Sequence, residues 1–462
     1  MKKIGDILLV VGGGLLFLIP ATHLMWSSGI KGSGAPVLWM FTGVSAAVIG
    51  LLARIDQGAT VRSISAKISD GYKAIAILTL NALILFTGLE LTAKVVFKAR
   101  NLLSAPPARE PEPREKSSYY ASQPWALQYW DEFASSRTEQ YHAYVLWRRA
   151  PFKGTTINID QNGIRLTPNA DCSSPSFKVF TFGGSPMWGT GAPDWGTIPA
   201  YLQAALEKVA DGPICVMNFA ESAYVSTQSV IELLLQLQSG NVPNWVFFYD
   251  GPNDVYSGYQ TGRSDVHENF DLLGARFEKR DARQSRPFME LVKSFALFSL
   301  ADSLVNKLSR EPHASAKLMT YESRGIDAAT LSDSIVQRYL GDYKMVDALA
   351  REYGFNYVFL WAPHISTGKK PLVAEEKALM RTMDPALMKL YHLTYQNIVR
   401  SAPQHKNLYY LGNVFDGVES LLWIDDAHVT PVGNQLIAQQ MLDIVTESRS
   451  FNQRGKQAAR NK

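Results

Sequence analysis

The sequence predicts an α/β protein: a three-layer α/β/α domain with a parallel sheet, preceded by three transmembrane helices. In the C-terminal part of the chain, short apolar runs alternate with longer helical segments, which is typical of a parallel sheet covered on both faces. In the N-terminal part, three consecutive apolar runs are each near the length that crosses a bilayer. The chain of 462 residues therefore divides into a membrane anchor and one α/β core.

Residues 1–100 form the predicted anchor. The apolar runs cover residues 7–25, 36–53 and 74–89. The third run extends to residue 97 if Glu90 and Lys94 pair. Basic residues precede the first run and also lie between the second and third runs, which places the N-terminus and the second loop in the cytoplasm. The basic residues after the third run oppose this orientation. Three spans then place the rest of the chain outside. The alternatives are buried core helices or, for the first run, a cleaved signal peptide.

Two short regions connect the anchor to the core. Residues 101–120 are rich in proline and in mixed charge, which predicts an extended, solvated linker. Residues 121–174 are rich in aromatic side chains and are expected to form a collar. These aromatic side chains either pack on the core as a lid or collar, or form a platform on which sugars stack.

Residues 175–448 form the predicted core. Strands are expected near residues 177–182, 214–219, 245–249, 356–361 and 408–411. Helices are expected near residues 198–209, 228–238, 286–308, 332–353, 373–399 and 432–447. Residues 255–330 exceed a simple crossover and predict a helical insertion beside the site. Residues 449–462 are a basic tail that we expect to be disordered.

Ser185 is the candidate nucleophile. It follows an apolar run and two glycines, Gly183 and Gly184, and it precedes a helical stretch. A strand that ends in this way exposes the serine at the carboxyl edge of the sheet, where open α/β folds bind ligands. A nearby helix N-terminus favours developing negative charge. The alternative is an ordinary turn.

His428 is the candidate base. A serine hydroxyl is a poor nucleophile until a base takes its proton, and the imidazole needs an acid to fix its tautomer. Asp425 lies three residues before His428 in the same loop and supplies such an acid. Of the eight histidines, only His428 has this arrangement; the alternative is a surface loop histidine.

Two further strand ends supply candidate donors for an oxyanion hole. Asn253 follows the buried run Trp245–Tyr249, so its side-chain amide is expected at the sheet edge, where it can donate to a tetrahedral oxyanion. The segment 215–226 also reads as a strand that runs into a loop, and a backbone N–H there is a second candidate donor.

In this order, the four segments resemble the consensus blocks of the SGNH (GDSL) hydrolase family, over roughly residues 175–445. The resemblance implies a Ser-His-Asp triad of Ser185, His428 and Asp425. It also implies that the oxyanion donors are the N–H groups of Ser185 and Ala223 and the side chain of Asn253.

Two residues depart from the family pattern. Gly184 stands where the family usually has Asp, and Ala223 stands where it usually has the oxyanion glycine. A backbone N–H survives the change to alanine, and we expect it to donate if the local φ is negative. The departures indicate a divergent, membrane-anchored bacterial branch.

The two cysteines, Cys172 and Cys215, are expected at the amino edge of neighbouring parallel strands, away from Ser185. A disulfide is geometrically reasonable there if the Cα atoms approach within about 7 Å. Such a bond is expected outside the cytoplasm and rarely inside it. Two buried, unpaired thiols are the alternative.

Composition limits the other classes of function. The net charge is only +4, and the basic residues lie at the membrane flanks and in the tail, so we expect no nucleic-acid partner. There is no zinc-like cluster, P-loop or dinucleotide-binding fingerprint, so we expect no metal and no cofactor. His364 follows an apolar run and either borders the cleft or has a structural role.

The sequence thus predicts a serine esterase in the inner (cytoplasmic) membrane of a bacterium, with several spans and its catalytic domain in the periplasm or outside the cell. The expected partners are the bilayer and an acylated glycan or lipid, and removal of O-acetyl groups from an envelope glycan is the preferred reaction. The alternatives are O-acetyl transfer to an envelope polysaccharide, lysophospholipase activity, and a non-catalytic glycan-binding or assembly protein on a degenerate fold.

Overall fold

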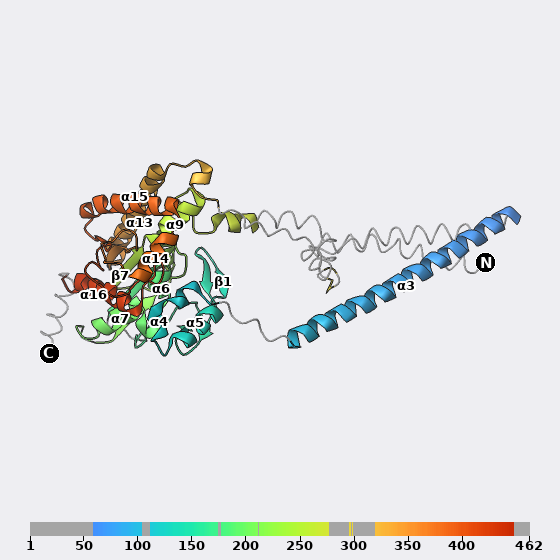
Figure 1. Cartoon of the computed structure of the whole chain (residues 1–462), viewed down its shortest axis with the longest axis horizontal. Coiled ribbons are helices and arrows are strands. Elements are labelled where there is room, and N and C mark those ends of the chain that lie inside the picture. Colours follow the sequence, from blue (N-terminus) through green and yellow to red (C-terminus); the bar gives the residue numbers. More distant parts are fainter. Residues whose placement is uncertain are drawn as a thin grey trace. The chain divides into compact units, whose positions relative to one another are not determined.

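The computed structural model describes residues 59–103, 111–173, 177–210, 212–276, 295–296, 298 and 319–447 (Figure 1). The chain divides into two units. The first comprises residues 1–108 and 275–314, and the second comprises residues 109–274 and 315–462.

The described part of the first unit is dominated by one long helix, α3 (Ala59–Leu103). Its segment Ala66–Ala99 is long and apolar enough to cross a membrane, and almost none of its most apolar window is buried. This helix contains the third predicted span, and Glu90 and Lys94 pair at 3.3 Å, as its extension required. The first two predicted spans lie outside the described residues. The structure therefore describes one such helix where the sequence predicted three.

A five-stranded parallel sheet forms the centre of the second unit. Its strands are β5 (Phe177–Gly183), β6 (Ile214–Asn218), β7 (Trp245–Asp250), β8 (Asn356–Trp361) and β9 (Leu408–Tyr410). The order across the sheet is β6-β5-β7-β8-β9. Each of these strands was predicted from its apolar run.

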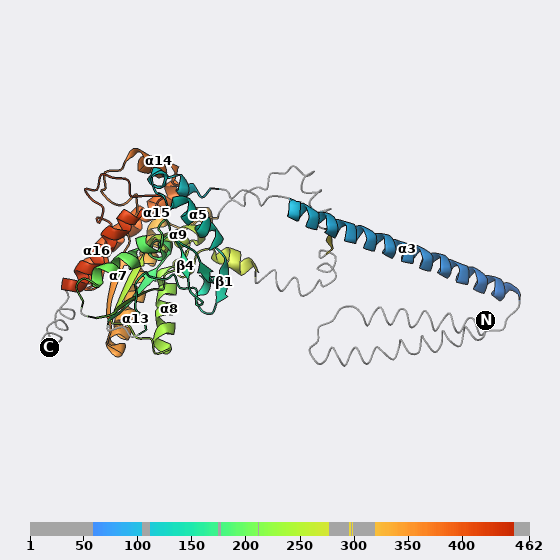
Figure 2. The same cartoon turned by 90° about the horizontal axis from the view of Figure 1, so that it is seen from below.

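Alternating side chains divide the core into two apolar layers, as the two-residue period of a strand requires. On β7, Trp245 and Phe247 belong to one layer, and Val246 and Phe248 belong to the other. Helices α7 (Ile198–Leu206) and α16 (Pro431–Glu447) cover the first layer and lie side by side (Figure 2). The second layer is covered by α8 (Ser226–Gln238), α9 (Pro252–Thr261), α13 (Ala328–Tyr353) and α15 (Pro385–Ser401). The second unit is thus a three-layer α/β/α domain.

One helix prediction needs correction, and another lies almost wholly outside the described residues. The single helix predicted over residues 373–399 is two helices, α14 (Ala374–Thr382) and α15. The break has a local cause, because Asp384 caps α15 by accepting from the Ala386 and Leu387 N–H groups, and Pro385 takes the first helical position. The predicted helix at 286–308 falls almost wholly outside the described residues, as does the tail.

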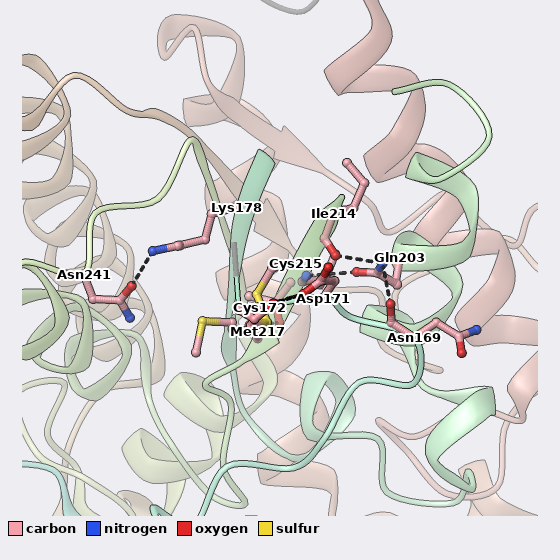
Figure 3. Close-up of a disulfide and its surroundings, with 12 residues drawn as sticks. Asn169, Asp171, Cys172, Lys178, Gln203, Ile214, Cys215, Met217 and Asn241 are labelled. Atoms are coloured by element: carbon pink, nitrogen blue, oxygen red, sulfur yellow. Dashed lines mark hydrogen bonds between the residues drawn. A yellow bond between two sulfur atoms is a disulfide. The ribbon is translucent and has the colours of Figure 1, made fainter. Parts of the chain in front are cut away.

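Cys172 and Cys215 form a disulfide, with their Cα atoms 4.9 Å apart (Figure 3). Cys215 lies on β6 opposite Lys178 of the neighbouring strand β5, so the bond is at the amino edge of the sheet, as the predicted strand order implied. The segment before β5 is fixed there a second time, because the Asp171 N–H donates to the Ile214 carbonyl. The alternative of two unpaired thiols does not describe this structure.

The segment before the sheet is folded onto the second unit. It contains η1 (Pro113–Lys116), α4 (Ser118–Ala121) and α5 (Ala126–Ser135), then the hairpin β1 (Glu139–His142) and β2 (Leu146–Arg149), and the pair β3 (Phe152–Lys153) and β4 (Asn158–Ile159). The aromatic side chains of α5 are buried in the first apolar layer, as a collar would be. Residues 113–116 and 118–121 are helical, whereas the sequence predicted an extended linker up to residue 120. Tyr120 explains the difference, because it is buried against that layer.

Candidate active site

The three residues predicted as a triad lie together at the carboxyl edge of the sheet. Ser185 begins the short helix α6 (Ser185–Trp188) directly after β5. The Nε2 atom of His428 lies 2.8 Å from Ser185 Oγ. Its Nδ1 atom lies 2.7 Å and 2.9 Å from the two carboxylate oxygens of Asp425. With the proton on Nδ1, the imidazole donates to Asp425 and accepts from the serine hydroxyl.

The loop that carries His428 holds the carboxylate in place. One Asp425 oxygen accepts the N–H groups of Ala427 and His428 at 2.9 Å and 2.7 Å. Arg114 Nη1 lies 3.6 Å from the other oxygen. Burial alone would raise the pKa of Asp425, but His428, Arg114 and the Ala427 N–H together hold that pKa well below its ordinary value. Asp425 is therefore an anion across the range in which an esterase works.

The neighbouring Asp426 lies apart from this chain of hydrogen bonds. Its carboxylate lines the cavity and lies 3.7 Å from Nε2 of His364, which is completely buried. His364 stacks on Tyr391 with ring centroids 3.7 Å apart, and its Nδ1 lies 2.8 Å from Ser366 Oγ. His364 thus lies behind the cleft. This agrees with a structural role, which is one of the two alternatives that the sequence left open.

Asn253 lies at the start of α9 and lines the same cavity as Ser185. A hydrogen bond orients its side-chain amide. Its Nδ2 donates one hydrogen to the Tyr224 carbonyl at 2.9 Å, which leaves the second amide hydrogen for another acceptor. Asp254 holds this corner, because its carboxylate accepts from Gly251 N at 3.1 Å and from the Ser226 hydroxyl at 2.7 Å. Gly184 lies against the amide, where a Cβ atom would overlap Asn253 Nδ2.

Ala223 lies on the cavity wall. The sequence made donation by its N–H conditional on a negative φ, whereas the observed φ is 63°. This left-handed conformation is one that glycine adopts freely and that costs an alanine roughly 1–2 kcal/mol. The chain therefore keeps at residue 223 a backbone shape that suits the usual family glycine. Ser185, as the first residue of a helix, has an N–H without an intrahelical partner.

A cavity of about 640 Å³ opens over the serine. The ionisable residues on its wall besides His428 are Arg114, Arg137, Glu139, Arg149, Glu268 and Asp426. Burial raises the pKa of Glu268 to about 8, with the charges of Asp254 and Asp426 adding to the effect. In the described part of the chain, no group of three or more His, Cys, Asp or Glu side chains is arranged to hold a metal ion.

Sequence reasoning missed two arginines that shape the site. Arg165 is buried, and it donates to Asp194 at 2.8 Å and to the carbonyls of Gly189 and Ala192 at 2.8 Å and 2.7 Å, so it fixes the loop after Ser185. The Asn-Gly-Ile-Arg turn that carries it was a usable signal. Arg114 gave no such signal, because it lies in a segment whose composition predicted a linker.

No family model and no curated relative matches this chain. Among solved structures, it is similar to the acetyl xylan esterase AlAXEase, at 14% identity over 58% of this chain and 100% of that chain, with a TM-score of 0.33. It is also similar to a member of the lipolytic protein G-D-S-L family from Veillonella parvula, at 11% identity over 59% and 100%, with a TM-score of 0.30. The acetylxylan esterase Axe2 from Geobacillus stearothermophilus is 14% identical over 58% and 94%, with a TM-score of 0.31. The G-D-S-L family of the Veillonella parvula protein is the family that the four sequence segments resemble.

Proposed function

We propose that this protein is a membrane-anchored serine ester hydrolase that removes small acyl groups, acetyl first among them, from a glycan of the cell envelope. The observation that carries the proposal is the continuous chain of hydrogen bonds from Ser185 Oγ through His428 to Asp425. Ser185 and His428 are 243 residues apart in the sequence, whereas His428 and Asp425 are 3 apart, so only the fold brings the serine to the pair.

The chemistry follows from the geometry. Ser185 Oγ attacks the ester carbonyl while His428 takes its proton, and Asp425 stabilises the imidazolium that forms. The tetrahedral oxyanion accepts from the free Asn253 amide hydrogen and from the N–H group of Ser185. Collapse of this intermediate releases the alcohol, with His428 returning the proton to it. Water, activated by the same histidine, then cleaves the acyl-serine.

The cavity supports a polar substrate with a short acyl group. Several charged side chains line it, and an extended fatty-acyl chain would desolvate them without forming hydrogen bonds in return. A sugar ring offers hydroxyl groups that pair with such a wall. This favours a glycan ester over a lysophospholipid.

The position outside the cytoplasm is part of the proposal. Helix α3 offers a membrane span, and the Cys172–Cys215 disulfide fits an oxidising compartment. Labelling of thiols in denatured protein from intact cells, before and after reduction, tests this. Free thiols without reduction would contradict the disulfide, and a reporter fused after residue 104 that is active only in the cytoplasm would contradict the topology.

The activity test uses the full chain in detergent with aryl acetate and long-chain aryl esters, and then with an acetylated polysaccharide. Ser185→Ala is expected to abolish acetate release, because nucleophile and base act as one unit. The thermal unfolding midpoint of this variant is expected to equal that of wild type. A fluorophosphonate probe is expected to label the wild-type protein at Ser185. Undiminished turnover by the variant would rule out the proposed mechanism.

A further inference from the structure

Residues 111–121, which we call the strap, follow the α3 segment in sequence and bring a charged side chain to the candidate triad. Arg114 is only 17% exposed, and its Nη1 lies 3.6 Å from Asp425 Oδ2. That oxygen is the one that also lies 2.7 Å from His428 Nδ1. The contacts of Asp425 with Ala427 and His428 come from its own loop, whereas Arg114 reaches it from a distant part of the chain.

The guanidinium is itself held in place. Glu112 accepts from Arg114 Nη2 at 2.5 Å and from Nε at 3.1 Å, so the planar group is gripped along one edge and leaves Nη1 to face Asp425. The Phe133 ring of α5 lies 5.7 Å from the guanidinium carbon. A cation fixed from two sides has lost most of its rotamer freedom before it acts on its partner.

The strap is also fastened to α14 and to the loop that follows Ser185. The Ser118 hydroxyl donates to Glu375 at 2.5 Å, at the start of α14. The Tyr120 hydroxyl donates at 2.7 Å to the Gly191 carbonyl, in the loop that follows Ser185. These contacts place the strap on the same side of the core as the serine and the acid.

Resting on the proposed hydrolase function, we propose that Arg114 is a positioning residue of the triad, so that hydrolysis requires the strap. Arg114 fixes the rotamer of Asp425, and through Asp425 it fixes the ring of His428. Its contact with the triad is made at Asp425 and not at the serine. A truncated protein that begins after the strap would keep Ser185, His428 and Asp425 and still lack part of the active site.

The charge of Arg114 provides a readout that a merely structural role would not give. A positive charge beside Asp425 disfavours the imidazolium form of His428, so its removal moves the midpoint of the pH–activity profile upward. The other titratable and charged groups close to Arg114 and Asp425 include Glu112 of the strap, the buried tyrosines Tyr120 and Tyr129, and Arg137, which pairs with Glu112 at 3.1 Å. Arg114 and His428 contact the same Asp425 oxygen at 3.6 Å and 2.7 Å, and over such a separation an effective dielectric constant of about 20 to 80 gives an upward shift of roughly 0.5–2 pH units.

The experiment measures acetate release by the full chain in detergent across pH. Arg114→Gln is expected to lower kcat about tenfold with little change in KM, and to move the profile upward as above. Arg114→Lys keeps the charge without the fork that grips both carboxylates, so it is expected to restore the profile but only part of kcat. Lys116→Gln is the matched control, because it removes the same charge from an exposed site of the strap, and both quantities are expected to match wild type.

The outcomes separate this inference from the proposed function. Wild-type protein that neither hydrolyses the esters nor reacts with the fluorophosphonate would refute the function itself. Active wild type with an unchanged Arg114→Gln variant would refute the role of Arg114 alone. An Arg114→Gln variant with reduced kcat, a lower unfolding midpoint and an unshifted pH profile would also overturn the inference. If Arg114→Gln does not fold, Arg114→Lys applies the same test.

Discussion

Gly184 is one of the two residues where this chain departs from the pattern of the family it resembles, and the structure gives a steric reason for a glycine. A Cβ atom at Gly184 would overlap Nδ2 of Asn253 and would lie 3.3 Å from the Tyr224 carbonyl oxygen. The backbone itself does not demand glycine, because φ is −85°, a value that any L-residue adopts. Gly184→Ala therefore acts through the amide of Asn253 and not through backbone strain.

The size of the effect follows from that contact. Relief of the overlap requires the amide to move by on the order of 1 Å, a displacement that in active sites costs about 100-fold in rate. Movement also breaks the bond from Nδ2 to Tyr224 that orients the donor. Loss of one oxyanion donor lowers kcat by about 10²–10³-fold, so Gly184→Ala and Asn253→Ala are both expected in that range, with KM nearly unchanged.

A double-mutant cycle tests the mechanism. In the Asn253→Ala background the amide is gone, so the added Gly184→Ala change is expected to cost less than about threefold. Gly341→Ala is the control for a glycine replacement, because a Cβ there meets nothing within 4 Å. Losses that multiply in the double variant would show that Gly184 acts independently of Asn253 and would refute the reasoning.

Three further predictions concern the acid, the disulfide and the cavity. Asp425→Asn is expected to lower kcat by about 10⁴-fold, and Asp426→Asn far less, because only Asp425 contacts His428 Nδ1. Cys172→Ser opens a loop of 43 residues and is expected to lower the free energy of unfolding by about 2–4 kcal/mol, measured by denaturant titration in detergent. The pKa of Glu268 lies at about 8 in the folded chain and near 4.5 when it is unfolded, so wild type loses stability as pH rises through that window. The Glu268→Gln variant does not lose this stability. Its unfolding free energy minus that of wild type is therefore expected to grow by roughly 1.4 kcal/mol per pH unit between about pH 5 and 8.

Each of these predictions has a contrary result. A larger loss for Asp426→Asn than for Asp425→Asn would mean that the wrong carboxylate has been assigned to the triad. Equal denaturation curves for Cys172→Ser and wild type, without reductant, would show that the disulfide does not form. Parallel stability profiles for Glu268→Gln and wild type from pH 5 to 8 would show that Glu268 is already ionised in the folded chain.

The sequence was sufficient for the parts of this molecule that short-range patterns determine. Each strand of the parallel sheet follows from a compact apolar run, and Asp425 and His428 pair within a single loop, so a fixed spacing reveals them. The Cys172–Cys215 contact was foreseeable because β5 and β6 are neighbours.

The remaining features depend on contacts between distant segments. Arg114 lies in a proline-rich stretch whose composition indicates solvation, and only the three-dimensional fold shows that Glu112 and Phe133 bury it beside Asp425. The positive φ of Ala223 was likewise hidden, because an alanine gives no local indication of a left-handed conformation. In both cases tertiary contacts overrode local preference.

The long separation between Ser185 and His428 has a consequence for synthesis of the chain. The proposed nucleophile leaves the ribosome early, but the proposed base arrives only with the segment directly before α16, the helix that packs on α7. A chain that ends before His428 is therefore expected to carry an inert serine. Reaction of Ser185 with an activity-based probe in cells would then count only molecules whose synthesis and folding are finished.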